Sequence, residues 1–313
     1  MAWSSRTIRS PGSATLQPNP AMAGDAELTF VRRGSSRNVR QADIPSEKTS
    51  QDSCEGAHHV KKSRATADAR GWEELARLDP LWAVASSPQL RHGKWDEEEF
   101  YEGGRRKVRK LMKRLDALGV PARSARALDF GCGAGRLTLP LADHFDAVVG
   151  VDIAPSMLAL ARMRAAGRPG LEFRLDETGD QSLLAGESFD LVYSGLVLQH
   201  LASVAAALAC LERLCAAVGP GGALVVQIPI WLRAPRPLRV RQRLYTALRR
   251  VGVPARVLYR RAGLHPMTMI CVPRERVEAC VRGAGLAIVR IDERTADDIV
   301  SLTIYADRSS VQL

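Results

Sequence analysis

The stretch Leu128-Asp129-Phe130-Gly131-Cys132-Gly133-Ala134-Gly135-Arg136 decides the fold of this 313-residue chain. It joins a short apolar strand to a loop with glycine at every second position, and we expect a helix to follow. Glycine allows a tight turn and lets a ligand approach the backbone closely, and the free N–H groups at a helix start favour polar or anionic ligand atoms. A strand–helix turn without a ligand is the alternative interpretation.

The second chemical signal is Asp152, which ends the next apolar run, seventeen residues after Gly135. A carboxylate at that point can accept hydrogen bonds from both hydroxyls of a ribose, as in dinucleotide-binding proteins. The dinucleotide pattern Gly-x-Gly-x-x-Gly, counted from Gly131, would need glycine where this chain has Arg136. The sequence therefore predicts a nucleoside ligand without a pyrophosphate at the loop.

From Arg126 onward, predicted strands and helices alternate, which is typical of a parallel sheet with crossover helices. Strands are expected at 127–130, 147–152, 171–175, 189–194 and 223–228. Helices are expected at 137–144, at 155–166 and at 273–284, and an Ala/Leu-rich helix is expected to end at the Gly-Pro-Gly-Gly turn at 219–222. The last two runs, 288–291 and 301–305, are too closely linked for a crossover helix. We expect them to pair antiparallel.

Three segments lie outside this alternation. Residues 1–70 are rich in Ser, Arg, Gly and Pro and are predicted to form a disordered basic tail, because they contain too little apolar surface to join a core. Residues 71–122 are predicted to form a helical cap, with Gly103-Gly104 as a break before a basic helix at about 105–118. Residues 123–313 are expected to form the ligand-binding α/β domain, within which 231–272 is an Arg-rich lid insertion.

The insertion concentrates the positive charge of the chain. The net charge is +11, and Trp231 to Arg261 contains ten arginines and no acidic residue. Within it, 238–251 is expected to be a helix with Leu244, Leu248 and Val251 on one face. Such a segment favours an anionic acceptor or an anionic membrane surface as partner, and a solvated lid is the plainer alternative. No DNA partner is expected.

The motifs in order resemble those of the class I S-adenosylmethionine (SAM)-dependent methyltransferases, within the broad group that acts on small molecules. The resemblance rests on Leu128–Arg136, on Val149-Gly-Val-Asp-Ile-Ala-Pro-Ser-Met157 and on Ser188-Phe-Asp-Leu-Val-Tyr-Ser194. It implies an α/β, Rossmann-like, doubly wound sheet of seven strands with an antiparallel last strand, and SAM as cofactor.

The resemblance also implies roles for single residues. Gly131, Gly133 and Gly135 would surround the methionine part of SAM, and Asp129 would orient the loop or the amino group. Asp152 would hold the ribose, Ile153 and Met157 would lie near the adenine, and Asp176 would meet the adenine amine, with Glu177 and Asp180 as rivals. Tyr193 and Ser194 would end the fourth strand, where the acceptor approaches.

His200 is the candidate general base, since a neutral imidazole can remove a proton from a hydroxyl; packing beside the cofactor is the alternative role. The six cysteines form no Cys-x-x-Cys pair and no zinc-type cluster with histidine, so no metal is expected. A cytoplasmic protein is the default expectation.

These residues favour methyl transfer to an oxygen or nitrogen of a small metabolite. A lipid-linked or membrane-associated acceptor, RNA, and a SAM-binding protein without methylation activity remain the alternatives.

Overall fold

A seven-stranded mixed sheet organises the chain, with strand order β3-β2-β1-β4-β5-β7-β6. The computed structural model describes residues 69–121, 123–232, 235–296 and 299–308. The strands are β1 (Arg126–Phe130), β2 (Ala147–Asp152), β3 (Leu171–Leu175), β4 (Phe189–Gly195), β5 (Val218–Leu232), β6 (Ala287–Ala296) and β7 (Ile299–Asp307). The first five pair in parallel, and β7 pairs antiparallel with both β5 and β6. The predicted fold class is confirmed.

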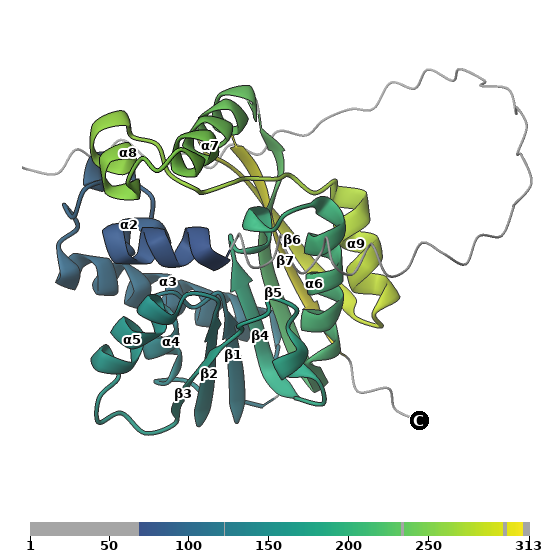
Figure 1. Cartoon of the computed structure of the whole chain (residues 1–313). Helices are drawn as coiled ribbons and strands as arrows, with labels where there is room; N and C mark the ends of the chain where they lie inside the picture. Colours follow the sequence, from purple (N-terminus) through teal and green to yellow (C-terminus); the bar gives the residue numbers. More distant parts are fainter. Residues whose placement is uncertain (1–68, 122, 233–234, 297–298, 309–313) are drawn as a thin grey trace, which may run out of the picture. The chain divides into compact units, whose positions relative to one another are not determined.

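Helices cover both faces of this sheet (Figure 1). The helices of the described residues include α2 (Pro80–Val84), η1 (Pro88–Leu90), α3 (Glu97–Leu118), α4 (Thr138–Leu141), α5 (Pro155–Arg164), η2 (Ser182–Leu184), η3 (Leu198–His200), α6 (Val204–Ala216), α7 (Pro235–Arg250), α8 (Ala255–Ala262) and α9 (Arg274–Gly283). Residues 69–78 are also helical. Helices α6 and α9 pack on one face of the sheet, and α3 and α4 pack on the other.

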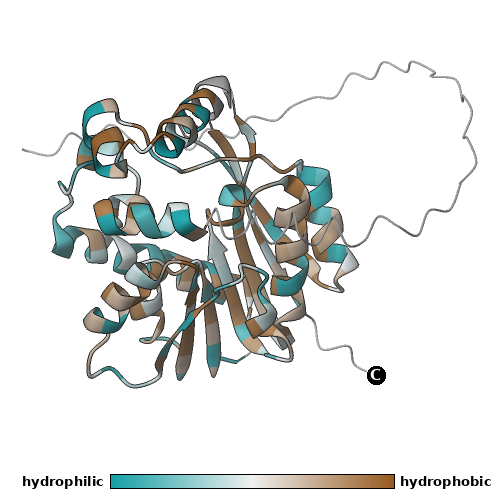
Figure 2. Cartoon of the chain, viewed as in Figure 1, coloured by the Kyte–Doolittle hydropathy of each residue, from teal (hydrophilic) through white to brown (hydrophobic). Residues whose placement is uncertain are grey.

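The apolar pattern explains where the core sits. The parallel strands are buried on both faces, so they read as continuous apolar runs, and Figure 2 shows the central strands mainly in brown. Cys210 and Cys215 of α6 are 1% and 0% exposed and join the core, as predicted for small apolar side chains. Helix α3 starts at the N-cap Asp96, whose carboxylate accepts the N–H of Glu99 at 2.8 Å, and ends at Gly119 in the left-handed conformation.

The predicted break at Gly103-Gly104 is wrong, because α3 runs through both glycines. An ideal Cβ on Gly104 would lie 2.1 Å from the carbonyl oxygen of Arg136. The glycine thus serves close packing between a helix and the glycine loop, and not the termination of a helix.

Two other boundaries differ from the prediction. Helix α4 stops at Leu141 and not at 144, because the following hydrogen bonds, Asp143 N to Pro140 O and His144 N to Leu141 O, are of the tighter i+3 type. The predicted turn at 219–222 lies inside β5. There a Cβ on Gly222 would lie 2.7 Å from the Phe189 oxygen, so glycine allows β5 to start close against β4.

The predicted helix in the Arg-rich segment is confirmed as α7, but its apolar face is different. Leu244 and Val251 are 48% and 76% exposed, whereas Tyr245 is 5% exposed. The reason is that Tyr245 packs with Ala255, Leu258 and Leu264, and only Leu248 of the predicted face joins this cluster.

The predicted tail lies outside the described residues, except that 69 and 70 are already helical. The described residues belong to one compact unit of the chain. No helix in the described ranges is long and apolar enough to cross a membrane.

Candidate functional site

The glycine loop lies at the carboxyl end of β1 and is tied to the neighbouring strand. Gly131, Gly133 and Gly135 have φ angles of +77°, +54° and +77°, which other residues rarely adopt. The N–H groups of Gly131 and Cys132 donate to the Val151 carbonyl at 2.7 and 3.0 Å. The sequence therefore needs glycine at these positions for the backbone conformation alone.

Asp152 connects the end of β2 to this loop. Its Oδ2 accepts the N–H of Gly133 at 2.8 Å, and its Oδ1 accepts the N–H of Ala154 at 2.9 Å. Part of the residue's surface stays exposed, yet surrounding atoms desolvate the carboxylate and raise its pKa, against the lowering effect of these N–H donors. Each carboxylate oxygen has a second acceptor position, so Asp152 can hold the loop and still receive ligand hydroxyls.

Asp129 lies beneath the loop and is 3% exposed. Its Oδ2 accepts the hydroxyl of Thr138 at 2.6 Å. Burial raises its pKa to about 6, opposed by the Thr138 hydrogen bond and the charge of Lys107 and supported by the charge of Asp152. Because this pKa lies close to neutral pH, a cation bound at the loop would shift the Asp129 carboxyl toward its charged form.

Asp176 is the most buried of the three acids predicted to meet an adenine. It is 4% exposed, its backbone N–H donates to the Asp152 carbonyl at 2.9 Å, and its carboxylate accepts the N–H groups of Gly179 and Gln181 at 3.1 and 3.3 Å. Burial raises its pKa. The rivals Glu177 and Asp180 are both exposed.

The two residues expected beside the adenine differ in burial. Ile153 is half-buried, whereas Met157 is 3% exposed and packs in a cluster with Ala134, Ala154 and Leu75. Through this cluster the helix at 69–78 packs beside the glycine loop and the residues that follow β2.

Tyr193 and Ser194 point to opposite faces at the end of β4, as successive strand residues do. Tyr193 packs in the core against α3. Ser194 is 0% exposed, and within the described residues its Oγ has no hydrogen-bond partner.

Both ring nitrogens of His200 contact other groups of the protein. Nδ1 lies 2.6 Å from the Thr268 carbonyl oxygen, and Nε2 lies 3.0 Å from Nε2 of Gln199. Because a carbonyl only accepts, Nδ1 carries the proton and Nε2 accepts from the Gln199 amide. Burial lowers the pKa of His200 to about 4, and the ring packs edge-on against Trp72 at 4.8 Å between centroids. The imidazole is neutral at physiological pH.

Two valines cover the glycine loop. An ideal Cβ on Gly133 would lie 2.5 Å from Val84 of α2, and one on Gly131 would lie 2.2 Å from Val197. Glu73 of the helix at 69–78 accepts the backbone N–H of Ser156 at 2.9 Å, at the start of α5. The N-terminal helices therefore touch the candidate site directly.

Sequence reasoning missed Asp79, which ties the N-terminal helices to α8. Asp79 is 2% exposed, and its Oδ2 accepts the hydroxyl of Tyr259 at 2.6 Å and the N–H groups of His92 and Gly93 at 2.6 and 3.1 Å. Before Pro80 it looks like an ordinary helix-start residue. No sequence signal points to a partner 180 positions away.

Arg91 strengthens the same connection. Its guanidinium carbon lies 4.5 Å from the Trp82 ring centroid and 4.9 Å from that of Tyr259, and it donates to the Gly263 carbonyl at 2.9 Å. We call the contacts of Asp79 and Arg91 with α8 and Gly263 the Asp79–Arg91 clamp.

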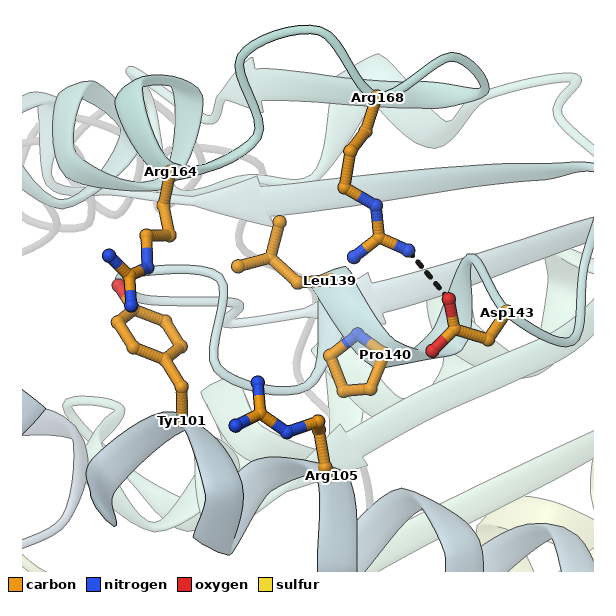
Figure 3. Close-up of a pocket in the computed structure, with 7 residues that line it drawn as sticks. All are labelled: Tyr101, Arg105, Leu139, Pro140, Asp143, Arg164 and Arg168. Carbon is orange, nitrogen blue, oxygen red and sulfur yellow. Dashed lines mark hydrogen bonds and ion pairs between the residues drawn. The ribbon is translucent and has the colours of Figure 1, made fainter. Parts of the chain in front are cut away.

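A cavity of about 1040 Å³ opens beside His200, between the N-terminal helices and the Arg-rich segment. A smaller one of about 200 Å³ lies between α3, α4 and α5 (Figure 3). Figure 3 shows three arginines around the smaller cavity, of which Arg168 pairs with Asp143 at 2.7 Å. Arg164 and Arg105 also pair with acids of α3. Its charges are thus already satisfied, and the larger cavity is the better candidate for a ligand.

Within the described ranges, no group of three or more His, Cys, Asp or Glu side chains could hold a metal ion.

The strand order, the glycine loop after β1 and the acid at the end of β2 together define the Rossmann-like fold of the class I methyltransferases. The family model described as "Methyltransferase domain" matches residues 128–226. The chain therefore carries a methyltransferase domain of the class I, SAM-dependent type over this range.

Two named relatives share part of the sequence. Trans-aconitate 2-methyltransferase of Deinococcus radiodurans is 41% identical over 126 residues, which cover 36% of this chain and 45% of that protein. Ubiquinone biosynthesis O-methyltransferase of Methylobacterium sp. is 39% identical over 110 residues, which cover 34% of this chain and 42% of that protein. The matched regions thus span less than half of each relative.

A solved structure shares the fold. The crystal structure of magnesium protoporphyrin IX methyltransferase from Synechocystis PCC 6803 with bound SAH matches with a TM-score of 0.50 and 21% identity, over 80% of this chain and 100% of that one.

Proposed function

We propose that this protein binds SAM at the glycine loop and transfers its methyl group to an oxygen or nitrogen atom of a small molecule. One observation carries the proposal. Asp152, the predicted ribose ligand, accepts the N–H of Gly133, so the loop and the carboxylate form one unit inside a methyltransferase domain. The named relatives act, by their names, on trans-aconitate and in ubiquinone biosynthesis, which agrees with a small-molecule acceptor.

The residues of the loop side fit the parts of SAM. In the proposal, the loop backbone at Gly131, Gly133 and Gly135, bent by their positive φ angles, lies along the methionine part. Asp129 attracts the amino group from beneath the loop and Asp152 holds the ribose. Ile153 and Met157 flank the adenine, and the buried Asp176 accepts from its amine.

When bound, SAM supplies a methyl carbon whose bond to sulfur breaks as a lone pair of the acceptor atom forms the new bond, the electron pair staying on sulfur. The protein's part is then to position the acceptor and to exclude water. We propose that the N-terminal helices act as a cap and that residues 231–272 act as a lid. Val84 on Gly133 and the Asp79–Arg91 clamp support this, because they join both segments over the loop.

His200 is proposed as a positioning residue and not as the main base. Its pKa of about 4 makes it a weak proton acceptor, and its Nε2 already accepts from Gln199. Through Nδ1 and Thr268 it holds the segment that borders the large cavity.

Calorimetry tests the cofactor assignment. SAM and S-adenosylhomocysteine should bind, and NAD should bind weakly or not at all, because Arg136 stands where a dinucleotide loop has glycine. Tight NAD binding without SAM affinity would overturn the proposal. Binding of SAM without methyl transfer to any acceptor would leave a SAM-binding protein.

A lipid-linked acceptor is the second candidate, favoured by the outer face of α7. Val240 and Leu244 are 62% and 48% exposed beside exposed arginines of the same helix. A basic helix with exposed apolar residues can lie on an anionic membrane surface. Co-sedimentation with phosphatidylglycerol vesicles, compared with phosphatidylcholine vesicles, tests this: binding that needs the anionic lipid supports it, and no binding leaves the soluble acceptor. An RNA acceptor is supported, among the described residues, only by the positive charge of the Arg-rich segment.

A further inference from the structure

The large cavity is built by segments that are far apart in the sequence. It has a volume of about 1040 Å³ and is bordered by residues 70–75, by the loop after β4, by α7 and by residues 266–270.

The charges of this lining do not cancel. Glu74 is its one acid and pairs with Arg249 at 2.6 Å, while it also accepts the hydroxyl of Tyr245. Arg243 and Arg250 are exposed, and among the described residues neither has an acidic partner. A guanidinium fork suits carboxylate and phosphate groups in particular. The cavity therefore presents two cations that are available to an anion.

Another part of the lining is apolar. Trp72, Leu75, Met267, Met269 and Ile270 all border the cavity. Trp72 is fixed by its edge contact with His200. A ligand that matches both parts has an anionic group and a carbon skeleton.

The helix at 69–78 borders both this cavity and the surroundings of the glycine loop. Glu74 and Trp72 line the cavity, whereas Glu73 accepts the N–H of Ser156 at the start of α5. Leu75 lies in the same apolar cluster as Ala134 of the glycine loop. A ligand of the cavity is thus adjacent to the proposed cofactor site.

We infer that this cavity is the acceptor site and that its ligand is an organic acid, with the carboxylate or phosphate group at Arg243 and Arg250 and the carbon skeleton against Trp72 and the two methionines. That the ligand accepts a methyl group rests on the proposed methyltransferase function. The binding chemistry itself follows from the lining.

The test compares two double variants of the full-length protein. R243Q/R250Q removes the two available cations from the cavity. R260Q/R261Q removes the same charge from exposed positions of α8 that do not line it. Calorimetry would measure the binding of 4-hydroxybenzoate and of tricarballylate, each beside its neutral amide, together with the binding of SAM and the thermal midpoint of each variant.

We expect the acids to bind at least tenfold more tightly than their amides, because hydrogen bonds to charged groups contribute more than neutral ones. R243Q/R250Q should weaken acid binding by about tenfold or more, with SAM affinity and thermal midpoint unchanged, and R260Q/R261Q should change acid binding less than about twofold. Equal binding of amides, equal losses in both double variants, or no acid binding to the wild type would overturn the inference.

Two further arms separate the alternatives. If acids bind but SAM does not, the proposed function fails and the acid site stands. If phosphatidylglycerol vesicles bind, compete with the acids and are lost in R243Q/R250Q alone, the acid group belongs to a lipid. If the acids bind without competition from vesicles, it belongs to a soluble molecule.

Discussion

Gly104 of α3 lies directly against the backbone carbonyl of Arg136, so that an ideal Cβ on Gly104 would come within 2.1 Å of that oxygen. An ideal Cβ on its neighbour Gly103 would lie 2.6 Å from a guanidinium nitrogen of Arg136, which is the far end of a flexible side chain. The two glycines are therefore inequivalent, although they stand side by side in one helix.

Gly104→Ala should destabilise the protein and weaken SAM binding, because the added methyl pushes α3 away from the glycine loop. Overpacking of this kind typically costs about 1–3 kcal/mol. Gly103→Ala is the matched control. It should keep or raise stability, by up to about 1 kcal/mol, because alanine favours helix more than glycine does. Urea denaturation and calorimetry with SAM measure both. Equal effects of the two variants would contradict the packing argument.

Asp152→Asn should weaken the binding of SAM and of S-adenosylhomocysteine alike, by roughly 10- to 100-fold, since a charged acceptor is lost. The amide also cannot accept from both Gly133 and Ala154, so the thermal midpoint without ligand should fall. Asp146→Asn, at an exposed position, is the control and should leave both quantities unchanged. Unaltered affinity in Asp152→Asn would remove the ribose role.

Asp176→Asn and Asp180→Asn separate the two acids that compete for the adenine. Asp176 is buried beside Asp152, whereas Asp180 is exposed and accepts from Thr178 and Ser182, which hold its pKa at about 2. Only Asp176→Asn should lower the affinity for S-adenosylhomocysteine, measured by calorimetry. A loss confined to Asp180→Asn would reverse the assignment.

Asp129 should make the unliganded protein less stable as the pH rises. Burial raises its pKa from 3.8 to about 6, so the folded state binds more protons than the unfolded state between these values. The stabilisation from this group is present in full below pH 3.8 and is lost as the pH passes through about 6. Asp129→Asn removes this dependence.

Urea denaturation of both proteins at several pH values between 4 and 7 would measure the effect. The free energy of unfolding of Asp129→Asn, relative to wild type, should increase over this range by an amount on the order of 2 kcal/mol. A constant difference would show that the carboxyl titrates at its ordinary value.

His200→Gln should raise the KM for the acceptor more than it lowers kcat, because His200 borders the cavity and holds Thr268. Since the pKa of His200 is about 4, the pH dependence of kcat between pH 6 and 7 should be the same in the wild type and in the variant. Labelled-methyl transfer across this pH range gives both readouts. A fall in kcat of about 100-fold or more with KM unchanged would identify a general base.

The sequence was sufficient for those features that depend on local pattern. Strand alternation, the glycine loop and Asp152 follow from apolar runs and from residues that end them, and the seven-stranded sheet with an antiparallel β7 agrees with the prediction. Packing across the chain was not accessible in this way. The role of Gly104 depends on a carbonyl 32 positions later, and Asp79 depends on Tyr259. The buried face of α7 was also not predictable from helical periodicity, because it is determined by the residues outside α7 that Tyr245 contacts.

The place of the helix at 69–78, beside both the large cavity and the glycine loop, has a consequence for how such enzymes diversify. The residues that border the large cavity come mostly from outside 128–226, the range shared with the methyltransferase family. Because the Asp79–Arg91 clamp joins those outer segments to each other, they are suited to being exchanged as a pair. Grafting residues 69–121 together with 231–272 onto a related domain should carry acceptor preference with them, whereas grafting either alone leaves Asp79 or Tyr259 without its partner.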